Sequence, residues 1–173
     1  QTEKNSLCVI IPRHIERTKK IHQNLKRIGF KSQVINHDEK ILDNTEIVLI
    51  NYYGAVKTYL ESTQNVFIGK SILEKLKRVG GQNPIEAAKM GCFIFHGPFV
   101  SNFKEIYEYF KKKGFSEEIR SPEELAKKLI NNFSNIEKVL DKTKIEELQI
   151  YSESILQKVI NEYDILINEN FKT

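Results

Sequence analysis

Residues 79–91, VGGQNPIEAAKMG, combine residue types that are suited to binding a nucleotide. Gly80 and Gly81 precede an expected helix start, where paired glycines let an anionic group approach backbone N–H groups. Glu86, one turn into that helix, can accept hydrogen bonds from a ribose diol, as acidic residues do in nucleotide-binding folds. The same loop carries three basic residues, Lys75, Lys77 and Arg78. The stretch therefore predicts a nucleotide pocket built on a helix start.

Helix capping alone explains part of the same stretch. Asn83 is a good N-cap, Pro84 suits the first helical position, and Glu86 completes a capping box. Capping does not account for the two glycines immediately before them. At this level both interpretations stand: a helix start and nothing more, or a helix start that serves a ligand.

The stretch PRHIER, residues 12–17, is a second candidate for phosphate binding and follows the apolar run LCVII. Arg13 and Arg17 stand four residues apart, and arginine suits bidentate contact with phosphate or carboxylate groups. His14 can donate a hydrogen bond to a ligand. The competing interpretation is a basic, solvated helix start.

A third candidate follows the apolar run EIVLI, in the stretch NYYGAVKTYL. Gly54 near a helix start lets the backbone approach a ligand, and Tyr52 or Tyr53 can stack on a base. Core packing of the tyrosines is the alternative. In the stretch that begins HGPFV, Ser101 is expected to cap the next helix.

These stretches follow short apolar runs, as expected of loops at the ends of buried strands. The runs are LCVII (7–11), SQVIN (32–36), EIVLI (46–50), NVFIG (65–69) and CFIFHG (92–97). Strands that alternate with helical patterns predict a parallel sheet covered on both faces. The expected fold class is therefore α/β: a Rossmann-like, doubly wound parallel sheet with helices on both faces, closed by C-terminal helices. Ligands of such sheets bind outside the carboxyl ends of the strands.

Helical periodicity places apolar faces between the runs. One face comprises Ile21, Leu25 and Ile28 before Gly29, and another comprises Phe103, Ile106, Tyr107 and Phe110 before Gly114. The sequence Ser121-Pro122-Glu123-Glu124 is a strong helix start, with a buried face expected at Leu125, Leu129 and Phe133. A further helical pattern runs through Leu148, Tyr151, Ile155, Val159, Tyr163 and Leu166. We expect a nucleotide-sugar-binding domain over residues 1–133 and a helical extension over 134–173.

Composition narrows the functional classes. The chain has 173 residues, a formal net charge of +4 and a calculated pI of about 8.9, short of the dense basic stripe typical of nucleic-acid binding. No apolar run is long enough to cross a bilayer. Cys8 and Cys92 lie inside apolar runs and are expected to be buried, and no His/Cys/Asp cluster has metal-ligand spacing.

Taken together, the sequence resembles the C-terminal domain of the Kdo transferases, from about residue 7 to residue 130. The resemblance rests on four ordered motifs: IIPRHIER (10–17), VFIGKS (66–71), GGQNPIEAAKMG (80–91) and GPFVSNFKEI (97–106). It implies one half of a B-type glycosyltransferase fold, in which the C-terminal half holds the sugar nucleotide. The nucleotide-binding residues that it implies are Pro12, Arg13, Tyr53, Gly54, Gly80, Gly81, Asn83 and Glu86, with Glu86 near the ribose.

The resemblance also implies an activity. Kdo transferases move the sugar acid Kdo from CMP-Kdo to a lipid A precursor in lipopolysaccharide biosynthesis, without a metal or another cofactor. The acceptor-binding N-terminal domain, with the catalytic base, is absent from this chain, so we expect this fragment alone to be inactive. The full-length enzyme would associate peripherally with the cytoplasmic face of the bacterial inner membrane, bind the lipid A precursor through the missing domain, and bind no nucleic acid.

Several departures from the family's pattern keep other functions open. Ile15 stands where the family usually has Pro, and Gln82 stands where it has His. Around Gly54 the family carries Asp-Thr-x-Gly-Glu-Leu, whereas residues 51–56 read NYYGAV, with both carboxylates gone. One alternative is a divergent domain that takes a different nucleotide sugar, and another is a non-catalytic binding or structural module. A nucleic-acid or membrane-surface binder rests only on basic residues and the C-terminal helices.

Overall fold

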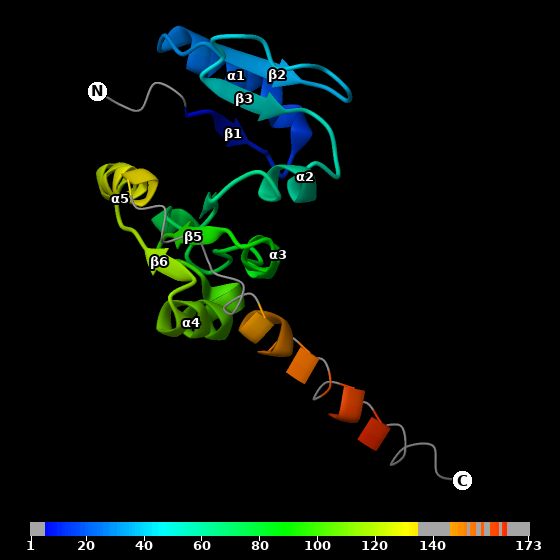
Figure 1. The fold of residues 1–173 in the computed structure, drawn as a ribbon. Coiled ribbons are helices and arrows are strands. Elements are labelled where there is room, and N and C mark those ends of the chain that lie inside the picture. Colours follow the sequence, from blue (N-terminus) through cyan, green and yellow to red (C-terminus); the bar gives the residue numbers. More distant parts are fainter. Residues whose placement is uncertain are drawn as a thin grey trace. The chain divides into compact units, whose positions relative to one another are not determined.

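The computed structural model describes residues 6–134, 146–151, 153, 154, 157, 160–162, 164 and 165 (Figure 1). Contacts along the chain divide it into two compact units, Gln1–Ser62 and Thr63–Thr173. The boundary expected at residues 133 and 134 stays a prediction: helix α5 ends at Ser134, and residues 135–145 lie outside the described residues.

The first unit is a three-stranded parallel sheet with its helices. Its elements are β1 (Cys8–Ile10), α1 (Thr18–Arg27), β2 (Ser32–Ile35), β3 (Ile47–Ile50) and α2 (Val56–Leu60). The strand order is β1-β3-β2, and α1 contacts both β2 and β3 (Figure 1). All four residues of β3 are buried, as the continuous apolar run predicts for the central strand of a covered parallel sheet.

Gly29 ends the first helix, as the sequence predicts. Its φ of 94° lies in the left-handed region that glycine adopts readily. The expected apolar face is only partly right, because Ile28 is 65% exposed whereas Ile21 and Leu25 are half-buried. Ile28 lies just beyond the last helical residue, where the chain has already left the helical path.

The second unit contains another three-stranded parallel sheet. Its elements are β4 (Asn65–Ile68), α3 (Ile85–Lys89), β5 (Phe93–His96), α4 (Lys104–Lys113), β6 (Ser116–Glu118) and α5 (Pro122–Ser134). The strand order is β4-β5-β6, with α3 against β5 and α4 against β6. The predicted strands and the α/β class are thus confirmed. The strands form two sheets of three, however, whereas the sequence suggested a single sheet.

Helix α4 supplies much of the core of the second unit. Tyr107 and Phe110 are buried, and Phe110 meets Phe115 edge to face with ring centroids 5.5 Å apart. Gly114, with φ at 76°, ends the helix as predicted. Residues 146–151 are helical and join this core, because Leu148 is buried and Tyr151 stacks on Tyr109 with centroids 3.8 Å apart. The rest of the predicted face there, Ile155, Val159, Tyr163 and Leu166, lies outside the described side chains.

Helix α5 begins as predicted, and its expected buried face is partly right, because Leu125 and Leu129 are half-buried. The Glu124 amide donates to Ser121 Oγ at 3.1 Å, while the Glu124 carboxylate accepts from the Arg120 amide at 2.8 Å instead of closing back on Ser121. Phe133 is 39% exposed, contrary to expectation. Asn132 is buried in its place, because its amide donates to Asn65 Oδ1 at the start of β4.

Cys8 is exposed, which corrects the prediction that both cysteines are buried. It lies at the start of β1, an edge strand of its sheet, whose burial is less complete than that of β3. Cys92 is buried immediately before β5, and burial raises the pKa of its thiol to about 11.

Candidate functional site

The carboxyl edge of the first sheet holds four of the predicted site residues. Pro12 and Arg13 follow β1, and Tyr53 and Gly54 follow β3. β1 and β3 are parallel neighbours, with Ile10 opposite Leu49, so both loops leave the same edge of the sheet. Arg13 is exposed and Tyr53 is 70% exposed. This edge therefore offers a cation and an aromatic face to a ligand.

Gly54 is required here by its backbone conformation. Its φ is 87°, which side chains disfavour, yet a Cβ atom at this position would meet nothing within 4 Å. The space beside the Gly54 Cα atom is open, so the phosphate of a ligand has room to approach the backbone. The helix that follows is α2, and its N-cap Ala55 is 2% exposed and packs in the core of the unit.

The same edge carries polar residues that the sequence argument did not select. Ile35 lies opposite Ile50 in the ladder, so Asn36 and Asn51 leave β2 and β3 side by side. The Asn51 amide donates to Asn36 Oδ1 at 2.9 Å. The rings of His37 and Tyr52 lie 4.5 Å apart. In the sequence, an asparagine follows each of two apolar runs directly. That these two asparagines lie side by side could be inferred only with knowledge of the strand order.

The glycine pair in the second unit is buried. A Cβ atom at Gly80 would collide with the carbonyl oxygen of Phe99, and one at Gly81 would lie 3.0 Å from Val100 Cα. Gly81 also has φ at 80°. Close approach of the loop after β5 accounts for both glycines without a ligand, and their predicted contact with an anion stays a prediction.

Asn83 lies directly before the N-cap of α3, which is Pro84, so the predicted capping positions are shifted by one residue. The Asn83 Oδ1 accepts from the Ile85 amide at 2.9 Å, and the Pro84 carbonyl accepts from the Ala88 amide at 3.1 Å. Glu86 is exposed, and among the described residues no hydrogen bond or ion pair engages its carboxylate. The carboxylate is therefore available to a ligand.

A serine joins the loops after β4 and β5. Ser71 Oγ accepts from the Gly97 amide at 2.8 Å and donates to the Ile68 carbonyl at 2.6 Å. The Ser71 carbonyl accepts from the Phe99 amide at 2.8 Å. A Cβ atom on Gly97 would collide with that carbonyl. These contacts hold the two loops together at the carboxyl edge of the second sheet.

Ser101 does not cap α4 as expected. Its hydroxyl donates to the Lys77 carbonyl at 3.1 Å, and no side-chain cap hydrogen bond is formed at the helix start. The competing partner is the loop that carries the glycine pair, which lies against residues 99 and 100. Ser101 thus adds to the contact between the loops.

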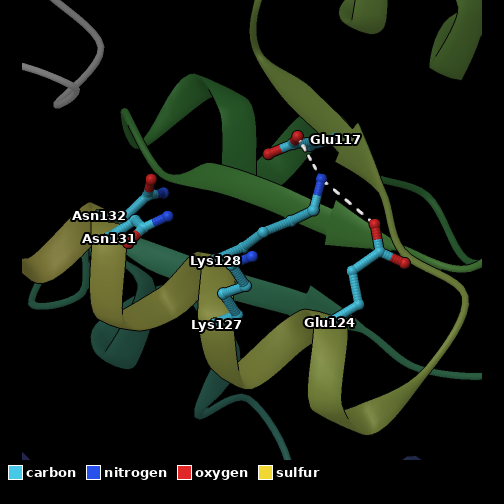
Figure 2. A pocket seen from close by; sticks show the side chains of 6 residues that line it. All are labelled: Glu117, Glu124, Lys127, Lys128, Asn131 and Asn132. Atoms are coloured by element: carbon cyan, nitrogen blue, oxygen red, sulfur yellow. Dashed lines mark hydrogen bonds and ion pairs between the residues drawn. The ribbon is translucent and has the colours of Figure 1, made fainter.

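A polar pocket on α5 serves a structural purpose. Figure 2 shows the Lys128 ammonium between the carboxylates of Glu117 on β6 and Glu124 on α5, the latter 3.3 Å away. Burial opposes the charge on Lys128, but the two carboxylates outweigh it and raise the pKa of this ammonium group. Asn131 and Asn132 line the same pocket (Figure 2). The network fastens α5 to the sheet.

Within the described residues, no group of three or more His, Cys, Asp or Glu side chains is placed to hold a metal ion. In that same part of the chain, every helix is too short or too polar to cross a membrane.

Comparison with known proteins relates this chain to one enzyme family. It is 24% identical over 139 residues to a 3-deoxy-D-manno-octulosonic acid transferase from Aquifex aeolicus, covering 80% of this chain and 36% of that protein. It is 27% identical over 161 residues to the enzyme of the same name from Rickettsia felis, covering 90% of this chain and 32% of that protein. No protein-family model matches the chain.

The fold agrees. The C-terminal CMP-Kdo binding domain of WaaA from Acinetobacter baumannii superposes with a TM-score of 0.73 and 18% identity, covering 83% of this chain and 73% of that chain. This chain is homologous to the Kdo transferases. The resemblance and the fold class inferred from sequence are therefore confirmed.

The chain spans about a third of the length of the Kdo transferases that it matches. Its predicted nucleotide-binding residues fall into two sets, one at the carboxyl edge of each sheet: Pro12, Arg13, Tyr53 and Gly54 in the first unit, and Gly80, Gly81, Asn83 and Glu86 in the second. The carboxyl edge is where α/β sheets bind their ligands.

Proposed function

We propose that this chain is the donor-binding part of a Kdo transferase and binds the nucleotide of CMP-Kdo. The observation that carries the proposal is the homology, which extends over 80% of the chain with one Kdo transferase and 90% with another. The likeness of its fold to a CMP-Kdo binding domain supports it. The exposed, unpaired groups at the carboxyl edges are of the types that a nucleotide requires.

In this proposal, the Arg13 guanidinium binds the phosphate and the Glu86 carboxylate accepts from the ribose hydroxyls. Arg13 is exposed and forms no ion pair within the described part of the chain, so its donors are available for bidentate phosphate contact. The Gly80-Gly81 loop has a positioning role, because its contact with residues 99 and 100 fixes the start of α3. Tyr53 offers an exposed ring to the base.

The whole protein would transfer Kdo to a lipid A precursor. An acceptor hydroxyl gives its proton to a general base and forms a bond to the sugar's anomeric carbon, while the bond from that carbon to the CMP phosphate breaks and CMP leaves. The base and the acceptor site belong to an N-terminal domain, and the full-length enzyme works at the cytoplasmic face of the inner membrane without a metal. Arg13 stabilises the charge on the departing phosphate.

Calorimetric titration with CMP, and with UMP for comparison, tests the nucleotide site. We expect CMP to bind more tightly than UMP, and Arg13→Ala to weaken CMP binding about tenfold or more because a charge-assisted hydrogen bond is lost. Glu86→Gln should weaken it by a smaller factor. Arg27→Ala and Glu105→Gln, which change the same residue types at exposed positions elsewhere, are matched controls. Equal binding by the wild type and both site variants would refute the assignment.

A second candidate is a domain with a changed or lost ligand, and one observation favours it. The Asn51 amide, which stands where the resemblance places a carboxylate, is engaged by Asn36 at 2.9 Å. Ala55 stands at the other lost carboxylate and is buried. Preference for UMP over CMP would support a different nucleotide sugar, and the absence of binding by either at millimolar concentration would support a binding or structural module.

A further inference from the structure

A second pocket lies within the second unit, at the carboxyl ends of β5 and β6. Its volume is about 390 Å³, and none of the predicted nucleotide-binding residues lines it. His96, the last residue of β5, stands beside Glu118, the last residue of β6, in the parallel ladder. Both side chains line the pocket together with Lys104 and Lys111 of α4.

His96 is almost completely buried at the wall of this pocket, at 3% exposure. Its Nδ1 lies 2.8 Å from the Gly97 carbonyl oxygen. A carbonyl only accepts, so the proton of the neutral ring must sit on Nδ1. Nε2 is then a bare acceptor, and it has no hydrogen-bond partner among the described residues although it is fully buried.

The surrounding protein does not supply the missing donor. The closest polar ring is that of Tyr107, whose centroid lies 4.4 Å from that of His96. Its hydroxyl already donates to the Gln82 carbonyl at 2.9 Å. A buried acceptor without a donor is costly, so a group that enters the pocket and donates to Nε2 would be favoured.

The charges around the pocket define the rest of the ligand. Lysines 77, 104 and 111 line it, against Glu108 and Glu118. Lys104 lies 3.7 Å from Glu108 and Lys77 lies 4.0 Å from Glu74, whereas Lys111 has no ion-pair partner among the described residues. An anionic group is therefore favoured near Lys111, while Phe99 and Pro98 provide apolar walls.

We propose that this pocket binds a small anion that carries a hydroxyl group, with the hydroxyl donating to His96 Nε2 and the anionic group facing Lys111. Two sources share this chemistry: a hydrogen phosphate and a hydroxycarboxylate. The site is independent of the nucleotide residues, so failure of CMP to bind and failure of these anions to bind are separate results.

The test is imidazole ¹H–¹⁵N NMR of the whole chain at pH 7.5, titrated with inorganic phosphate and, separately, with gluconate, each against chloride at equal ionic strength. We expect a saturable shift of His96 Nε2 with at least one anion, and the Nδ1–H tautomer before addition. The anion that gives the shift identifies the source. The absence of a saturable shift with either anion would mean that water alone fills the pocket and would overturn the proposal.

Matched variants locate the contact. The amide of His96→Asn can still reach the Gly97 carbonyl but leaves nothing at the position of Nε2, so binding should fall about tenfold. His96→Gln places a polar group near the position of Nε2 and should retain most of the binding. Lys111→Met should weaken binding about threefold, as expected for a partly exposed charge, and Lys112→Met, outside the pocket, should not.

Equal losses in Lys111→Met and Lys112→Met would show nonspecific attraction and overturn the proposal. Unchanged binding in His96→Asn would do the same. Backbone amide spectra check that each variant is folded. Should His96→Asn fail to fold, the wild-type Nε2 shift and the Lys111 and Lys112 pair still decide.

Discussion

The carboxyl edges of the two sheets use glycine for opposite purposes. Gly54 in the first unit has open space beyond it, and only its φ of 87° excludes a side chain. Gly80 in the second unit has no space, because the Phe99 carbonyl occupies the position of a Cβ atom. The first edge is open at Gly54, whereas at Gly80 two loops of the second unit pack together. A glycine before a helix therefore identifies either a binding surface or an internal contact.

The largest effect is expected for Gly80→Ala. The new methyl group would collide with backbone, which cannot move as a side chain can, so the second unit should lose about 3 kcal/mol of stability. Amide hydrogen exchange, read separately for each unit, measures the loss. Protection in the first unit should not change. A loss below about 1 kcal/mol would mean that the loops separate easily, which would end the contrast between the two edges.

Gly54→Ala should destabilise the first unit by about 1.5 kcal/mol through backbone strain alone. Because asparagine tolerates the left-handed region better than alanine does, Gly54→Asn should recover part of this loss. The same hydrogen-exchange measurement applies. Identical losses for both variants would indicate that a steric contact, and not φ, sets the cost at this edge.

A smaller difference is expected between two asparagines, one at each edge. Asn83→Ala removes the side-chain hydrogen bond to the first amide of α3 and should cost about 1 kcal/mol, and Asn83→Ser should restore most of it. Asn51→Ala removes the exposed hydrogen bond to Asn36 and should cost less than about 0.5 kcal/mol. Urea unfolding of the four proteins compares them. If Asn51→Ala lowered the free energy of unfolding more than Asn83→Ala does, the hydrogen bond at the first edge would contribute more to stability than the one at the second.

The smallest expected effect depends on pH. Burial lowers the pKa of His96 below 6.5, against the raising effects of the Gly97 carbonyl and Glu118, and Lys111 lowers it further. Below pH 6.5 the His96 side chain therefore binds a proton more readily in the unfolded chain than in the folded chain. The free energy of unfolding consequently falls as the pH falls. The stability difference between wild type and His96→Gln should narrow from pH 8 to pH 5.5. A difference that stays constant in urea unfolding would contradict the burial argument.

Features with a strong local cause could be predicted from the sequence. The run Ile47–Ile50 is apolar throughout because β3 is covered on both faces, and Gly29 and Gly114 end helices through their own backbone preference. The hydrogen bonds from the Ile85 amide to Asn83 and from the Glu124 amide to Ser121 are equally local. Strand β6 was missed because Ser116–Glu118 has only three residues and no apolar pattern, so its pairing with β5 decides its structure.

What depends on contacts distant in sequence could not be predicted. Phe133 is exposed where burial was expected, and Asn132 is buried because Asn65 offers it a hydrogen-bond partner. The sequence Gly80-Gly81 fits the close approach of a ligand and the close approach of a neighbouring loop equally well, because both require the absence of a side chain. His96 was hidden in a strand pattern, and its unsatisfied nitrogen follows from the position of the Gly97 carbonyl.

The connection between Ser71 and Gly97 has an evolutionary consequence. The Ser71 hydroxyl accepts from the Gly97 amide, and the Ser71 backbone lies close to Gly97, so a side chain at position 97 would require the loop at position 71 to move. A larger residue at position 71 would break the same hydrogen bond. The two positions, 26 residues apart, should therefore have changed together during divergence. Related proteins should tolerate paired substitutions at positions 71 and 97 where they do not tolerate single ones. The sequences of the two loops should therefore change together.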